Sequence, residues 1–194
     1  MTTTAETLPR IRRWKRVEYE RLVELGMFTG ERLELIDGLL LFREPQGVRH
    51  STGIRRVVDA LRAVLGPEWR VDSQLPIALD DDSEPEPDVS VVAHDPALYR
   101  VAHPSRPALV VEIADSSYRF DRADKMSLYA RGAVPEYWLV DLVHEALRLH
   151  RDPEPAPAAP YGWHYRTVQI LKPPATVSAL IAPAHPISVA DLLP

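Results

Sequence analysis

The sequence predicts an α+β fold (mixed α/β) with one central, bent, mixed sheet flanked by helices. Predicted strands outnumber predicted helices along the chain. The segment 108–114 is almost wholly apolar, which is typical of a central buried strand. No Gly-rich phosphate loop follows a strand, so the Walker and Rossmann nucleotide-binding folds are excluded.

Composition indicates one domain and excludes several kinds of site. The chain has 194 residues, of which 45% are hydrophobic and 26% charged, as in an average globular domain. We expect a flexible N-terminus over 1–13 and a single domain over 14–194, with a Pro/Ala-rich loop at 152–160. The absence of cysteine excludes disulfides, thiolate zinc sites, Fe–S clusters and a cysteine nucleophile.

Charge and hydropathy restrict the partners. The formal net charge of −5 argues against non-specific coating of nucleic acid, although it allows a local basic groove beside an acidic site. No apolar run is long enough to span a membrane, and the N-terminus lacks the apolar segment of a signal peptide. We therefore expect a cytoplasmic protein without a membrane partner.

Local patterns predict the elements of the first half of the chain. Apolar residues at helical spacing predict helices over 17–25 and 50–65, the second with its N-cap near Ser51 or Thr52. Asp37-Gly38 between apolar residues predicts a β-hairpin. The elements expected next are a strand over 69–79, an acidic loop with prolines over 80–87 and a short strand over 88–92.

Local patterns also predict the helix and strands of the second half of the chain. After a connecting loop and the buried strand, apolar residues before Gly132 predict a helix over 118–131. The elements expected after it are strands over 136–141, 146–150 and 161–171 and a short terminal segment over 188–193.

Glu112 is the most informative residue, because it lies in the middle of the apolar strand ALVVEIA. Burying a carboxylate costs several kcal/mol unless it is paired or binds a metal. Strand alternation places it on one face with Val110 and Ala114, as a site in a cleft requires. The alternative is a buried ion pair between Glu112 and an arginine.

Asp88 opens the preceding strand directly after Pro87. Taken alone, it is typical of a turn. Beside Glu112, however, it would form a pair of carboxylates that repel unless a proton or a divalent cation lies between them. The two residues together therefore favour a metal site.

Lys125 lies on the helix that leaves the C-terminal end of the central strand, so its side chain can reach back over that strand. There it could hold or deprotonate a water, or neutralise developing charge. The alternative is a solvated lysine paired with Asp121 at i,i+4 spacing.

Five segments in this order resemble the Uma2 family of small bacterial proteins, also called domain of unknown function 820, within the PD-(D/E)XK nuclease superfamily. They are Glu34-Leu35-Ile36-Asp37-Gly38, Pro87-Asp88-Val89, Val110-Val111-Glu112-Ile113, Asp121…Lys125…Tyr129 and Glu136-Tyr137-Trp138-Leu139-Val140-Asp141. The resemblance implies a restriction-endonuclease-like fold and metal-dependent hydrolysis of phosphodiester bonds in DNA. It also implies a homodimer.

The resemblance assigns roles to four residues. Asp88 matches the aspartate of the PD motif, Glu112 the acidic residue of (D/E)XK, and Glu34 an additional acidic position. These three would bind Mg²⁺ or Mn²⁺, which prefer oxygen ligands. The superfamily's lysine is expected at 114, where this chain has Ala114, so Lys125 is its substitute.

Two departures leave a second function open. Ala114 stands in place of the lysine, and Asp115 adds a negative charge where the family carries a small residue. The alternative is a catalytically inactive nuclease-fold protein that acts as a binding or assembly module; a third hypothesis is a structural ion-pair network in a protein of unrelated function. A nuclease needs positive surface around the acidic site. The candidates for it are Arg12, Arg13, Lys15, Arg16, Arg55 and Arg56.

Histidine patterns do not favour a zinc site, because no HxH or HxxxH pair occurs. His50 opens the second predicted helix, where it would either approach the cleft or act as a helix cap. Tyr129 is predicted to pack in the core, with a protein interface as its alternative. The strand over 136–141 is a candidate surface for the homodimer.

Overall fold

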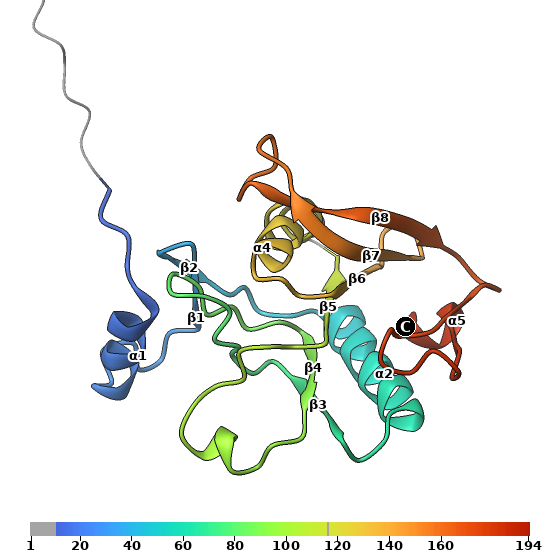
Figure 1. Ribbon diagram of the computed structural model, residues 1–194, viewed down its shortest axis with the longest axis horizontal. Coiled ribbons are helices and arrows are strands. Elements are labelled where there is room, and N and C mark those ends of the chain that lie inside the picture. The colour runs from blue at the N-terminus through green and yellow to red at the C-terminus, as the bar shows by residue number, and fades with distance from the viewer. Residues whose placement is uncertain (1–10, 116) are drawn as a thin grey trace, which may run out of the picture.

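The structure is a computed structural model that describes residues 11–115 and 117–194. Most of the N-terminus predicted to be flexible therefore lies outside the described residues. The main element is a six-stranded sheet with the order β3-β4-β5-β6-β7-β8 (Figure 1). Only β5 and β6 are parallel, and the other neighbours are antiparallel, which confirms the predicted mixed sheet. Its strands are β3 (Trp69–Ser73), β4 (Val89–Ala93), β5 (Leu109–Ala114), β6 (Glu136–Asp141), β7 (Ala146–Pro155) and β8 (Trp163–Leu171).

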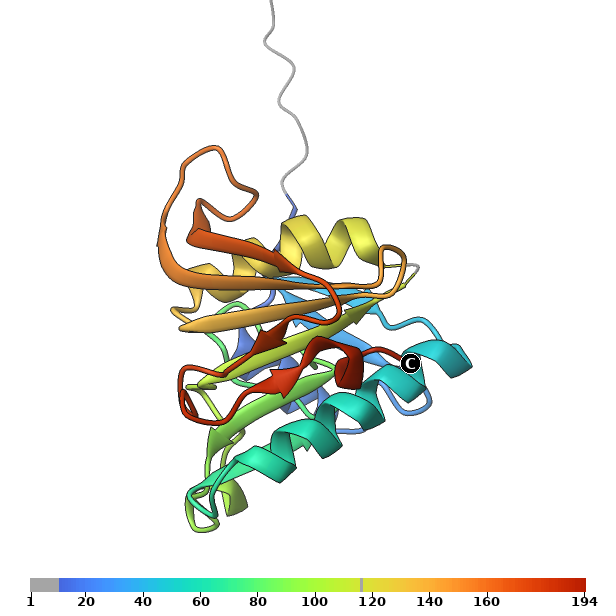
Figure 2. The same cartoon turned by 90° about the vertical axis from the view of Figure 1, so that its right-hand side faces the viewer.

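Helices cover both faces of the sheet (Figure 2). Helix α2 (Val48–Val64) packs on one face, where Val111 and Ile113 of β5 point, and α4 (Met126–Arg131) packs on the other, where Val110 points. Every residue of β5 is buried, as its apolar sequence predicts. Glu112 lies on the same side of β5 as Val110 and therefore faces the α4 side.

A hairpin carries Glu34 to the edge of this core. Strands β1 (Leu33–Ile36) and β2 (Leu39–Phe42) pair around Asp37 and Gly38, both with positive φ, as the Asp-Gly signal predicts. A Cβ at Gly38 would lie 2.5 Å from the Cβ of Arg13, so glycine is required there. All of β1 is buried, which places Glu34 inside the molecule.

The helix predicted over 118–131 has an irregular middle. It consists of α3 (Tyr118–Phe120), the π-helical turn η2 (Asp121–Lys125) and α4. π-Helical turns occur frequently at functional sites, and this one presents Lys125 toward β5.

Three predicted boundaries were wrong. The strand expected over 69–79 ends at Ser73, because Gln74 has φ 54° and its N–H donates to the carbonyls of Pro87 and Asp88. Helix α2 begins two residues earlier than expected, with Gly47 as its N-cap. The Pro/Ala-rich loop is shorter than 152–160, because β7 continues to Pro155.

Prolines fit into β7 because this part of the strand lies beyond the end of β6. The pairing of β6 with β7 stops at Glu136 and Arg151, whereas β8 continues to pair as far as Pro155. A proline that lacks an N–H is tolerated where no neighbouring strand needs that donor.

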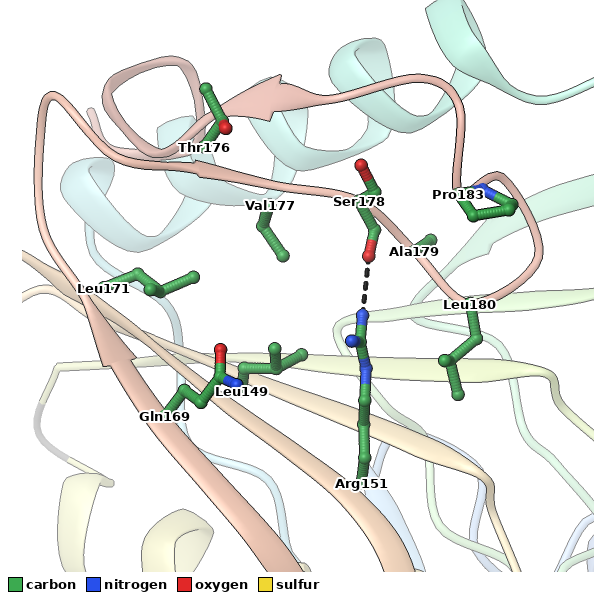
Figure 3. A pocket seen from close by; sticks show the side chains of 10 residues that line it. All are labelled: Leu149, Arg151, Gln169, Leu171, Thr176, Val177, Ser178, Ala179, Leu180 and Pro183. Carbon is green, nitrogen blue, oxygen red and sulfur yellow. Dashed lines mark hydrogen bonds between the residues drawn. The ribbon is translucent and has the colours of Figure 1, made fainter.

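The C-terminal residues pack beside α2 on the same face of the sheet and cover β7 and β8. They comprise β9 (Thr176–Val177), β10 (Ile187–Ser188) and α5 (Val189–Leu192). A cavity of about 330 Å³ lies beneath them, and across it Arg151 donates to the carbonyl of Ser178 over 2.6 Å (Figure 3). The buried Glu136 accepts from Arg151 and from the N–H of Leu180, so this ion pair holds the C-terminal residues onto the sheet.

Strand β6 cannot supply a dimer interface, contrary to the interpretation of its sequence. It is fully buried and pairs with β5 on one side and β7 on the other. The homodimer itself stays a prediction. Among the described residues, no helix is long and apolar enough to cross a membrane.

His150 should make the fold sensitive to acid. It is buried beside the rings of Tyr137 and Tyr165, and neither ring nitrogen has a hydrogen-bond partner among the described residues. Burial, with the charges of Arg148 and Arg122, lowers its pKa to about 4, below an ordinary value of about 6.5. Between these values the unfolded chain binds the proton more tightly, so stability is complete above about pH 6.5 and falls as the pH drops toward 4.

The expected loss from His150 alone is about 2 kcal/mol at pH 5. Urea denaturation at pH 7.5 and pH 5 should show that His150→Phe loses less stability on acidification than the wild type, by about this amount. An equal loss in both proteins would show that His150 is not the group responsible.

Candidate active site

A cleft of about 610 Å³ opens where the hairpin, the start of α2, the end of β5 and η2 meet. All four residues predicted for the site line it. Its polar lining residues are Glu34, Arg43, Glu44, Gln46, His50, Asp88, Glu112, Asp115, Ser117, Asp121 and Lys125.

Lys125 joins two of the predicted carboxylates. Its ammonium lies 3.1 Å from Oε1 of Glu112 and 3.3 Å from Oε2 of Glu34. Lys125 is only 5% exposed and Glu112 2%. The alternative of a solvated lysine paired with Asp121 was therefore wrong. The reach of Lys125 back over β5 is confirmed.

Asp88 lies directly against Glu112 from the neighbouring strand. Its backbone N–H donates to Oε2 of Glu112 over 3.2 Å, and its Oδ2 accepts from the N–H of Ile113 over 2.9 Å. His50 Nε2 is 3.0 Å from the same Oδ2, so His50 approaches the cleft, one of the two alternatives for this residue. The other oxygen, Oδ1, is 3.4 Å from the amide of Gln46.

The two acids differ in their electrostatics. Burial raises the pKa of Glu112 to about 8, against the opposing effect of Lys125, and the negative charge of Asp88 adds to the rise. Burial also acts on Asp88, but the hydrogen bond and charge of His50 outweigh it and lower the pKa of Asp88. Burial opposes the charge of Lys125, whose pKa is nevertheless raised well above its usual value by Glu112 and Glu34.

Within the described chain, the cleft brings few oxygen ligands together for a divalent metal. Across residues 11–115 and 117–194, no group of three or more His, Asp and Glu side chains is arranged to hold a metal ion. Asp88 and Glu112 do adjoin, and Mg²⁺ is commonly held by one or two carboxylates with several waters. These two residues are the candidate ligands for such an ion. Glu34 lies across the ammonium of Lys125, and its role as a ligand stays a prediction.

Comparison with known proteins identifies the family. The family model Uma2, described as "Putative restriction endonuclease", matches residues 16–189. The chain belongs to the Uma2 family. This membership supports a hydrolase of the nuclease type, related to restriction endonucleases.

A solved structure shows the same fold as this Uma2 chain. It is a crystal structure from Anabaena variabilis described as a "putative nuclease belonging to DUF820". The two chains are 20% identical and superpose with a TM-score of 0.64, over 88% of this chain and 96% of the other. The expected nuclease-type fold is thereby confirmed. No curated protein matches the Uma2 chain.

Arg43 and Tyr129 contact the predicted carboxylates of this Uma2 chain, and neither was assigned to the site by sequence. Arg43 lies 2.6 Å from Glu86 and 3.6 Å from Asp88, so an arginine pairs with acidic residues at the cleft, as a structural ion-pair network would require. The sequence feature that could have pointed to Arg43 is its position directly after the predicted hairpin.

Tyr129 is buried in the core as predicted, yet its hydroxyl also donates to Oε1 of Glu112 over 2.6 Å. The sequence feature that could have pointed to this contact is the i+4 spacing of Tyr129 from Lys125, which places both side chains on one helix face.

The basic residues expected around the site lie elsewhere. None of the six lines the cleft. Four of them pair with carboxylates near α1 (Arg16–Glu24), the hairpin and the acidic loop. These pairs are Arg12 with Glu18, Arg13 with Asp37, Lys15 with Asp82 and Arg16 with Glu20.

Proposed function

We propose that this Uma2 chain is a metal-dependent endonuclease that hydrolyses phosphodiester bonds in DNA. Asp88 and Glu112 would hold Mg²⁺ or Mn²⁺, with Glu34 as a further candidate ligand. The observation that carries the proposal is that Asp88 and Glu112 both line an open cleft, where the backbone N–H of Asp88 donates to the Glu112 carboxylate and Lys125 lies against Glu112. The nuclease family supports the same reaction class.

The protein's own groups would prepare the phosphate for attack. A bound Mg²⁺ supplies charge stabilisation on the phosphate and a lowered pKa of a water molecule. Because the pKa of Lys125 is raised, the lysine stays protonated and serves as a donor to the developing negative charge rather than as a base. His50 and the N–H of Ile113 hold Asp88 in its orientation.

The second candidate is a catalytically inactive nuclease-fold protein that acts as a binding or assembly module. One observation favours it: the six basic residues expected to attract DNA do not line the cleft. A module of this kind would keep the fold and the buried ion pairs without turnover.

A plasmid assay separates the two candidates. With Mg²⁺ or Mn²⁺, supercoiled plasmid is expected to become open-circular and then linear, and EDTA or Asp88→Asn should abolish the conversion. Asp59→Asn, an exposed change on α2, is the matched control and should cleave like the wild type. No cleavage with either metal, together with no metal binding by calorimetry, would favour the inactive module.

A further inference from the structure

We infer that the cleft receives an unpaired nucleotide, so that DNA is cut in single-stranded or unpaired regions in preference to continuous duplex. Phe42 and Phe120 would stack on bases beside the phosphate that is cut. This inference rests on the proposed nuclease function and specifies its substrate class.

Two phenylalanines line the acidic cleft and do not pack in the hydrophobic core. Of the three in the chain, Phe28 stacks on Tyr19 and packs against a core cluster. Phe42 at the end of β2 and Phe120 at the end of α3 belong to none of the core clusters of the described residues. Both line the cleft that holds Glu112, and Phe42 is 70% exposed. Burial therefore does not account for Phe42, whereas stacking on a base would.

The cations of the cleft are already engaged. Arg43, His50 and Lys125 are the basic residues that line it in the described chain, and each is within ion-pair distance of a carboxylate. Duplex binding depends on cations that neutralise phosphates on both strands. With few cations available and a net charge of −5, base stacking is the stronger source of affinity at this site.

The burial of the two acids also favours a single strand over a duplex as the substrate. Asp88 and Glu112 line the cleft and are both buried, whereas Phe42, which lines the same cleft, is 70% exposed. The phosphate that is cut must come close to them. A flexible single strand can bend its backbone into the cleft, while paired bases hold the backbone of a duplex to a regular helix. The volume of about 610 Å³ lies within the range of sites that enclose small ligands.

The test compares three fluorescent DNAs of one sequence: a single strand, its duplex, and the duplex with an unpaired central bulge. Binding is measured by anisotropy without metal, and cleavage positions are mapped with Mg²⁺. The single strand should bind about tenfold more tightly than the duplex, and cuts in the bulged DNA should fall at the bulge. A 2-aminopurine in the single strand should be quenched on binding, as stacking requires.

Variants assign the effect to the aromatic rings. Phe42→Ala and Phe120→Ala should each weaken single-strand binding about tenfold and reduce the quenching, and Phe42→Tyr should restore both. Val168→Ala, at an exposed position on β8 outside the cleft, should bind like the wild type. Equal binding and cutting of single strand and duplex, with no effect of Phe42→Ala, would overturn this inference and leave the nuclease proposal standing. Failure to bind or cut any of the DNAs would overturn both.

Discussion

Glu112→Gln is expected to abolish metal binding and to lower DNA cleavage about a thousandfold, the equivalent of roughly 4 kcal/mol of transition-state stabilisation. The change keeps the size of the side chain and removes its charge. The amide oxygen can still accept from Lys125 and Tyr129, which both donate to Oε1 of Glu112, and only the hydrogen bond from the N–H of Asp88 to Oε2 is lost. The loss would therefore come from the missing carboxylate rather than from collapse of the cleft.

Calorimetric titration with Mn²⁺ and plasmid cleavage measure the two effects of Glu112→Gln. Thermal unfolding must show that the variant is folded. Glu24→Gln, which removes an exposed carboxylate on α1, is the control and should retain both properties. Unchanged Mn²⁺ binding in Glu112→Gln would mean that Glu112 is not a metal ligand.

Lys125→Met is expected to lower the free energy of unfolding by about 3–5 kcal/mol, because it leaves two buried carboxylates without their shared cation. The ammonium of Lys125 lies within 3.3 Å of both Glu34 and Glu112, and all three side chains are buried. Cleavage should also be lost, since Lys125 is the donor proposed for the developing charge. Urea denaturation at pH 9, where Glu112 with its pKa of about 8 is ionised in the wild type, measures the stability.

Two comparisons separate charge from packing in this result. Lys172→Met, at an exposed position after β8, should leave stability within about 0.5 kcal/mol of the wild type. Adding Glu34→Gln to Lys125→Met should restore part of the loss, because one of the two unpaired charges is removed. A loss below about 1 kcal/mol in Lys125→Met would show that this buried pairing does not form in solution.

Local sequence patterns were sufficient to predict most of the helices and strands. The Asp37-Gly38 hairpin and the buried strand β5 agree with the predictions, since turn preference and apolar content are local properties. The early end of β3 and the extension of β7 to Pro155 were missed. Both depend on hydrogen bonds to residues distant in sequence, and short patterns do not contain that information.

Some residues of the candidate site could also be identified from the sequence, and others could not. A glutamate within an apolar strand is unusual because burying its charge costs free energy. Glu112 could therefore be identified from the sequence. Arg43 and the hydrogen bond from Tyr129 could not, because an arginine after a hairpin and a tyrosine on a helix are ordinary in sequence. Only their positions against Asp88 and Glu112 make them part of the cleft.

The mixed fold and the resemblance to the Uma2 family could be read from the sequence, which also predicts the set Glu34, Asp88, Glu112 and Lys125 for the site. The pairing of these charges, with Lys125 between Glu34 and Glu112 and His50 on Asp88, is visible only in the folded chain. Burial and partner distance set the energy of a charge, and both arise only when strands, hairpin and helix pack together.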